Sequence, residues 1–252
     1  MSAFKDHFSG HAQGYASARP GYPRALFDWI ASLTEQRGLA WDAGCGNGQA
    51  AVSLARDFDS VVASDPSAGQ VALAPPHPRI EYRVEAAEDC SLPRASVDAA
   101  CVAQALHWFD LPRFFAAIDR VLKPGGVLVA WTYETCRVAP GVDAVFDRLY
   151  RQRLGPWWPP ERRLVESGYR DIELPLAPVG SIPELAIELD WTLPQFLDYL
   201  RSWSASARCQ RETGRDAVGE FAGALGQAWG PPDATRKVTW PLAIRAGRRV
   251  SA

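Results

Sequence analysis

The chain has 252 residues, of which 47% are hydrophobic and 22% charged, so it can form one large core and is too apolar to be disordered. Its formal net charge of −2 argues against binding to nucleic acid or an anionic membrane, and no segment approaches membrane-spanning length. The five cysteines form no CxxC pair and have no histidine at metal-ligand spacing, which favours a cytoplasmic protein with reduced thiols and no metal site.

The first part of the chain predicts a helix, a strand and a second helix. Residues 23–33 carry apolar side chains at helical spacing, and the apolar run 39–42 predicts the first strand. Alternate glycines follow in residues 44–48, and residues 49–58 return to a helical pattern. A strand, a glycine turn and a helix present backbone N–H groups to a ligand, which predicts a nucleotide-like cofactor. The simpler interpretation is a turn that uses glycine only for its backbone angles.

The alternation then continues through the next seventy residues. Strands are predicted at residues 60–65, 80–84, 97–103 and 127–131. Asp110 can cap a helix over residues 111–122, which the Lys123-Pro124-Gly125-Gly126 turn ends. Strands that alternate with helices predict an α/β fold with a parallel sheet and right-handed crossovers.

After Trp131 the sequence becomes rich in Trp, Pro and Arg. We expect a single domain over residues 1–252, with its core in residues 1–131, a mostly helical cap in 132–235, and a last strand and tail in 236–252. Within the later part we predict strands at 169–174, 185–191 and 237–242, a helix opened by the Thr192-Leu193-Pro194-Gln195 capping box, and a helix at 216–229.

The spacing of the glycines bears on the kind of cofactor. A dinucleotide site requires G-x-G-x-x-G, whereas Gly44, Gly46 and Gly48 follow G-x-G-x-G directly behind Asp42. Asp65, at the end of the second predicted strand, suits ribose hydroxyls in either case. The turn alone therefore leaves a nicotinamide-dependent oxidoreductase of the Rossmann class open as an alternative.

Several further motifs occur in a fixed order along most of the chain. They are Asp42 to Gly48, Asp65-Pro66-Ser67, Ala87-Glu88-Asp89, Val97-Asp98, Gln104-Ala105-Leu106-His107-Trp108-Phe109 and Leu122 to Gly126, with Tyr15 to Pro23 before them and Leu200 to Ala205 after them. In this order they resemble the class I S-adenosylmethionine-dependent methyltransferases, and more narrowly the small-molecule group that includes trans-aconitate methyltransferase-like proteins. The resemblance implies a Rossmann-like, doubly wound, mostly parallel seven-stranded sheet with a mostly helical cap.

The resemblance also implies S-adenosyl-L-methionine as cofactor and a position for each cofactor-binding residue. The methionine and ribose portion would be lined by Asp42, Ala43, Gly44, Gly46 and Gly48, and Asp65 would bind both ribose hydroxyls. The adenine would pack on Pro66 and have Ala87 and Glu88 at its edge. Gln104 would face the sulfonium side of the cofactor. Other interpretations are a solvated loop carboxylate for Glu88 and a structural cap for Gln104. Ala86 stands where the family often has Ser or Asp, so a polar adenine contact is missing there.

Candidates for binding the methyl acceptor occur in two parts of the chain, near residues 15–19 and in residues 108–133. Trp108, Trp131 and Tyr133 follow predicted strands and suit the positive charge of a sulfonium, although tryptophans also build cores. Tyr15 belongs to the N-terminal motif, and Arg19 could bind a substrate carboxylate, bind the methionine carboxylate or cap the N-terminal segment.

The need for a catalytic base depends on the acceptor. A carboxylate is already a nucleophile at neutral pH, whereas a hydroxyl, amine or carbon acceptor needs a proton acceptor, for which His107 is the best-placed candidate. The alternative is that His107 only packs beside Trp108 and orders its loop. The sequence leaves both roles open.

We therefore expect a cytoplasmic methyltransferase that modifies a small molecule, with a carboxylate as one acceptor, and that acts as a monomer or homodimer. A nucleic-acid amino-methyltransferase would have an Asp/Asn-Pro-Pro-aromatic run where this chain has Gln104-Ala105-Leu106-His107. A cofactor-binding module without catalysis remains a further alternative.

Overall fold

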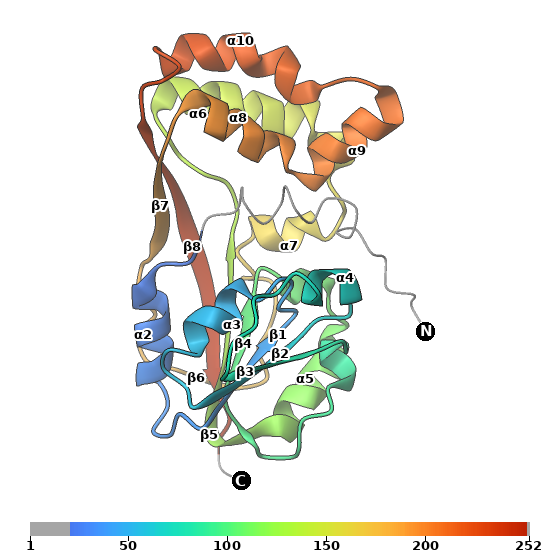
Figure 1. Ribbon diagram of the computed structural model, residues 1–252, viewed down its shortest axis with the longest axis vertical. Coiled ribbons are helices and arrows are strands. Elements are labelled where there is room, and N and C mark those ends of the chain that lie inside the picture. Colours follow the sequence, from blue (N-terminus) through green and yellow to red (C-terminus); the bar gives the residue numbers. More distant parts are fainter. Residues whose placement is uncertain (1–20, 251–252) are drawn as a thin grey trace.

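The computed structural model describes residues 21–250, which form an open sheet flanked by helices (Figure 1). The strands are β1 (Leu39–Ala43), β2 (Ser60–Ser64), β3 (Ile80–Arg83), β4 (Val97–Ala103), β5 (Leu122–Tyr133), β6 (Ala177–Pro178), β7 (Ala186–Trp191) and β8 (Arg236–Arg248). Their order is β3-β2-β1-β4-β5-β8-β6, and β7 pairs with β8 outside this path. Strands β1 to β5 are parallel, and β8 runs antiparallel to β5. The mostly parallel, Rossmann-like fold is thus confirmed.

The described sheet has eight strands, whereas seven were expected, because β8 is unusually long. Its second half pairs with β5 inside the sheet, from Leu242 to Arg248. Its first half, from Arg236 to Pro241, leaves the sheet and pairs with β7. The resulting two-stranded ribbon rises from the sheet to the cap (Figure 1).

Helices cover both faces of the sheet. They are α2 (Arg24–Ser32), α3 (Gln49–Leu54), α4 (Ala68–Val71) and α5 (Leu111–Val121). The apolar side of α2 packs with α3 on one face, and α5 covers the other (Figure 1). As predicted, the Asp110 side chain caps α5 by accepting a hydrogen bond from the Arg113 N–H.

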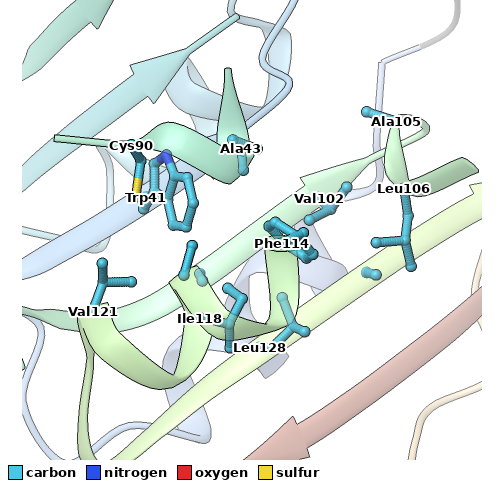
Figure 2. Packing of buried hydrophobic residues seen from close by; sticks show 14 of the residues in the cluster. Trp41, Ala43, Cys90, Val102, Ala105, Leu106, Phe114, Ile118, Val121 and Leu128 are labelled. Carbon is cyan, nitrogen blue, oxygen red and sulfur yellow. The ribbon is translucent and has the colours of Figure 1, made fainter. Parts of the chain in front are cut away.

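The packing beneath α5 fixes the strand ends that carry the sequence motifs. Trp41 of β1 and Phe114 of α5 are buried 6.1 Å apart between ring centroids, with Val102 of β4 nearby (Figure 2). The Trp41 indole N–H donates to the Ser64 hydroxyl at 3.0 Å, which ties β1 to β2. A dense core holds its neighbours in place, so the loops that leave β1, β2 and β4 start from rigid positions.

The helices of the cap lie beyond the carboxyl ends of the parallel strands (Figure 1). They are α6 (Pro140–Asp147), α8 (Leu193–Arg201), α9 (Ser204–Thr213) and α10 (Ala217–Trp229), and the π-helical turn η3 (Arg148–Arg153) continues α6. Thr192 and Gln195 form the predicted capping box of α8. Within residues 21–250, no helix combines the length and the apolar character needed to cross a membrane.

The middle of the segment assigned to the cap returns to the sheet. Helix α7 (Arg162–Glu166) and β6 lie here, and Val165, Tyr169 and Ile172 join the buried cluster around Trp41. The predicted strand at 169–174 is wrong, because Gly168 and Tyr169 both have positive φ and reverse the chain. Its apolar residues pack on the core from an irregular segment instead. The preceding helix ends before residues 123–126 as predicted, but β5 begins at Leu122 and not at 127, and residues 123–126 form an irregular part of it, where the register with β4 shifts and Gly125 has φ +80°.

Candidate active site

The glycine loop between β1 and α3 has the shape of a ligand cradle. Gly44 has φ +71°, and a Cβ there would lie 2.7 Å from the Cβ of Ala105, so only glycine fits. Gly46 has φ +54°, but the nearest atom to a Cβ there would be the Gln70 Oε1, at 3.8 Å. Among residues 21–250, the loop is therefore packed on one side at Gly44 and open at Gly46, where a ligand can approach the backbone.

Asp42 supplies buried acceptors beneath this loop. Its side chain is fully buried, and neither carboxylate oxygen has a hydrogen-bond partner among residues 21–250. Burial raises the pKa of Asp42 to about 7; the backbone at Ala51 lowers it, and the charge of Asp65 raises it further. Buried polar atoms are normally satisfied by a partner, so these oxygens fit a cofactor or ordered water that completes the site.

Asp65 joins the end of β2 to the glycine loop. Its Oδ2 accepts from the Gly46 N–H at 3.0 Å, and its Oδ1 accepts from the Ser67 N–H at 2.9 Å. The carboxylate thus lies beside the open part of the cradle, with the half-buried Pro66 next to it. This position agrees with the expected ribose and adenine contacts, which stay predictions.

Glu88 has a structural contact that neither sequence interpretation included. It lies in the 3-10 turn η1 (Ala87–Asp89), beside the buried Ala87, and its Oε1 accepts from the Asp110 N–H at 2.8 Å. The side chain thereby connects the loop after β3 to the start of α5. Its adenine contact stays a prediction, and the direct finding is that Glu88 orders the wall of the expected adenine site.

Gln104 closes the gap between the ends of β4 and β5. Its Oε1 accepts from the Thr132 hydroxyl at 2.7 Å and from the Tyr133 N–H at 2.9 Å, while its Nε2 donates to the Tyr133 carbonyl at 3.2 Å. It does so from a backbone with φ +55°, which is uncommon for residues other than glycine. Strained backbone of this kind often marks a functional position.

A cleft opens where Gln104 meets the cap. It encloses about 680 Å³ of space, open solvent included. Sheet and cap residues both line it: Gln104, His107, Trp108, Tyr133, Glu134, Trp158, Pro159, Arg162, Tyr199, Ser202, Trp203 and Ser204. Five of these side chains are Trp or Tyr, so the cleft has largely aromatic walls.

The structure brings together some of the predicted acceptor-binding residues and not others. Trp108 and Tyr133 line the cleft. Trp131 does not, because its ring is fully buried beneath α2 and packs edge-on against Tyr22 and Phe27 at 5.4 and 6.1 Å. We expected Trp131 at the rim of the site because of its position at the end of a predicted strand, but its ring faces the core. Tyr15 and Arg19 lie outside the described residues.

His107 lines the cleft from the 3-10 turn η2 (Leu106–Trp108) and contacts a buried tyrosine. Its Nδ1 lies 2.9 Å from the hydroxyl of Tyr169, which is completely buried. Burial raises the pKa of Tyr169 well above its usual value, although the Thr132 hydroxyl and the backbone at His107 counteract this in part. Tyr169 therefore remains a protonated phenol at neutral pH and can donate to Nδ1.

The cap residues of the cleft were not identified from the sequence. Arg162 is the clearest example: its guanidinium lies over the Trp158 ring, with Cζ 4.7 Å from the ring centroid. The Trp-, Pro- and Arg-rich composition of residues 132–165 was a signal, but it did not show which side chains converge. The Leu200 to Ala205 motif was a second signal, since Ser202, Trp203 and Ser204 line the cleft.

Comparisons with known proteins show which family and fold the chain resembles. Residues 41–130, which contain the glycine loop and Gln104, match the family model of a methyltransferase domain. A candidate methyltransferase of Dictyostelium discoideum is 34% identical over 239 residues, which cover 93% of this chain and 90% of that protein. A solved structure, described as a candidate type II methyltransferase from Anaeromyxobacter dehalogenans, is 52% identical with a TM-score of 0.87 and covers 93% of this chain and 99% of that one. A candidate methyltransferase from Anabaena variabilis, 19% identical with a TM-score of 0.55 over 88% of this chain and 98% of that one, shares the fold alone.

Proposed function

The chain belongs to the class I S-adenosylmethionine-dependent methyltransferases, and from this premise we propose that it methylates a carboxylate of a small organic acid held in the cleft. Membership of this family argues against the two alternatives from the sequence, a nicotinamide-dependent oxidoreductase and a cofactor-binding module without catalysis. The narrower likeness to trans-aconitate methyltransferases belongs to this proposal. A monomeric or homodimeric state and a cytoplasmic location stay predictions from the sequence.

The residues around the glycine loop fit the methyl donor. Gly46 leaves the backbone open, Asp42 has two buried acceptor oxygens without a hydrogen-bond partner in the described part of the chain, and Asp65 lies beside the loop. We propose that these residues hold the methionine and ribose portions. When bound, S-adenosylmethionine supplies a methyl group activated by a sulfonium, so the protein mainly has to align the acceptor and exclude water.

The observation that carries the proposal is the position of the cleft. It begins at Gln104, at the carboxyl end of β4, and extends between the sheet and the cap. Ligands of open α/β folds bind at this edge of the sheet. The aromatic rings of the cleft can shield an acceptor from water.

The contact between Tyr169 and His107 is compatible with an acceptor that needs no base, because in one tautomer of the imidazole Nδ1 accepts from the phenol. When the phenol donates to Nδ1, the proton of the neutral imidazole lies on Nε2, and this nitrogen donates a hydrogen bond instead of accepting a proton. A carboxylate acceptor suits this arrangement, because its oxygen is already deprotonated at neutral pH. His107 then orients the acceptor, and no proton has to leave the site.

The experiment is a turnover screen with labelled methyl donor and two matched sets of acceptors. One set contains carboxylic acids, including trans-aconitate, and the other contains phenols and alcohols of similar shape. We expect labelled products from the acids only, and mild alkali should release the label because methyl esters hydrolyse. Alkali-stable products from phenols would refute the carboxylate, and calorimetry that finds no binding of S-adenosylhomocysteine would refute the cofactor site.

A further inference from the structure

Arg162 presents unused hydrogen-bond donors at the cleft. Its Nε donates to the Tyr150 hydroxyl at 2.7 Å, and its Nη2 donates to the Glu134 carbonyl at 2.6 Å. A guanidinium has five N–H donors, and these contacts use two of them. Three remain, including both on Nη1, and none has a hydrogen-bond partner among residues 21–250.

The charge of Arg162 also lacks a carboxylate partner in the described part of the chain. No ion pair there includes it, whereas Arg153 of the same cap is paired with Glu220 at 2.7 Å. Glu134 contacts Arg162 through its backbone carbonyl, and the Glu166 carboxylate accepts from the Tyr150 hydroxyl, so neither carboxylate is paired with the guanidinium. The neutral groups around Arg162 thus fix the guanidinium in place without pairing its charge.

Aromatic rings continue the wall from Arg162. The guanidinium lies over Trp158, whose ring is 5.5 Å from that of Trp203, and Trp203 is in turn 5.5 Å from Tyr199. All four residues line the same cleft. The Trp158 and Trp203 rings are tilted by 53° and those of Trp203 and Tyr199 are nearly perpendicular, so the wall offers both faces and edges to an aromatic ligand, and the guanidinium beside them suits its carboxylate.

We propose that Arg162 is the recognition site for the carboxylate of a flat aromatic monocarboxylic acid. The proposal rests on the proposed function and names its substrate class. The fork of free N–H groups binds the carboxylate, while Trp158 and Trp203 contact the ring. Because Glu134 brings one negative charge to the cleft, a monoanion is favoured over acids with several carboxylates.

The test measures binding of phenylacetate, cinnamate and indole-3-acetate, each against its primary amide, by calorimetry in the presence of S-adenosylhomocysteine. We expect at least one acid to bind about tenfold or more tighter than its amide, because charged hydrogen bonds are the stronger ones. In Arg162→Gln this preference should vanish while S-adenosylhomocysteine binds as before. Arg163→Gln is the matched control, since that arginine is exposed and lies outside the cleft.

Two results would overturn the proposal: no preference of the wild-type protein for any acid, or an equal loss of acid and amide binding in Arg162→Gln. Should Arg162→Gln lose S-adenosylhomocysteine, Glu134→Gln decides instead, because removing its charge should tighten acid binding about threefold and leave the amide unchanged. Weaker or unchanged acid binding in that variant counts against Arg162 as the anchor. Failure of the wild-type protein to bind S-adenosylhomocysteine is a separate result, which refutes the proposed function.

Discussion

Substituting alanine at Gly44 and at Gly46 should separate the structural and the ligand-binding duties of the glycine loop. Both residues have positive φ, so alanine at either position costs about 1–2 kcal/mol of backbone strain. At Gly44 the new methyl would also lie 2.7 Å from the Ala105 Cβ and 3.0 Å from the Phe109 ring. A methyl group has no rotamer by which to avoid the overlap.

The overlap at Gly44 adds about 1–3 kcal/mol, the usual cost of overpacking a core. The free energy of unfolding should therefore fall by about 2–5 kcal/mol in Gly44→Ala and by about 1–2 kcal/mol in Gly46→Ala. For a domain of this size each kcal/mol lowers Tm by about 2–4 °C. Gly46→Ala should instead lose affinity for S-adenosylhomocysteine, because its methyl enters the open side of the cradle.

Urea denaturation without ligand measures the first effect, and calorimetry with S-adenosylhomocysteine measures the second. Equal destabilisation of the two variants would show that the overlap of the new methyl group with Ala105 does not lower the free energy of unfolding. Wild-type affinity in Gly46→Ala would show that the cofactor does not approach the loop at that residue. Either result refutes the corresponding half of the reasoning.

Three other substitutions test single residues of the site. Asp65→Ala should weaken S-adenosylhomocysteine binding by about 1–3 kcal/mol, because charged hydrogen bonds to the ribose are lost. Unchanged affinity in calorimetry would show that Asp65 does not bind the ribose. His107→Gln should lower kcat by less than about tenfold on an acid that turns over, since losing a true base costs about 10²–10⁴. Burial raises the pKa of Asp42 from 3.8 to about 7, so the folded state holds this proton more tightly; the contribution of Asp42 to stability is complete below about pH 4 and decreases by about 4 kcal/mol as pH rises through 7. Asp42→Asn should remove that fall, and urea denaturation of both ligand-free proteins from pH 4 to 8 checks it.

The cofactor half of the site was predictable because its signals are local. Asp42 is the penultimate residue of β1 and Asp65 directly follows β2, and the carboxyl ends of parallel strands meet at one edge. The cap of α5 and the capping box of α8 were predictable for the same reason, since each involves residues three apart. The extent of β8 was not, because its two halves pair with different strands far away in sequence.

The acceptor half depends on contacts that no local pattern encodes. Nothing near Arg162 in the sequence shows that it donates to the Glu134 carbonyl, 28 residues earlier. In the same way, the partner of His107 is Tyr169, 62 residues later, in a segment that the apolar pattern assigned to a strand. Trp131 shows the converse, since its position at a strand end suggested the rim and its side chain faces the core.

Arg162 and Tyr169 lie on one short segment between the cap and β6, and this connects the two halves of the site. Helix α7 carries the arginine that faces the cap rings, and the turn behind it carries the tyrosine that bonds to His107. Val165, between them, is buried in the core cluster around Trp41, so the segment is anchored to the sheet. A rigid anchor fixes the acceptor relative to the glycine loop, and such alignment is what methyl transfer from an activated donor chiefly requires. Substitutions that loosen this segment, such as Val165→Ala, should therefore reduce kcat more than S-adenosylhomocysteine affinity, and the opposite result would place the limiting alignment elsewhere.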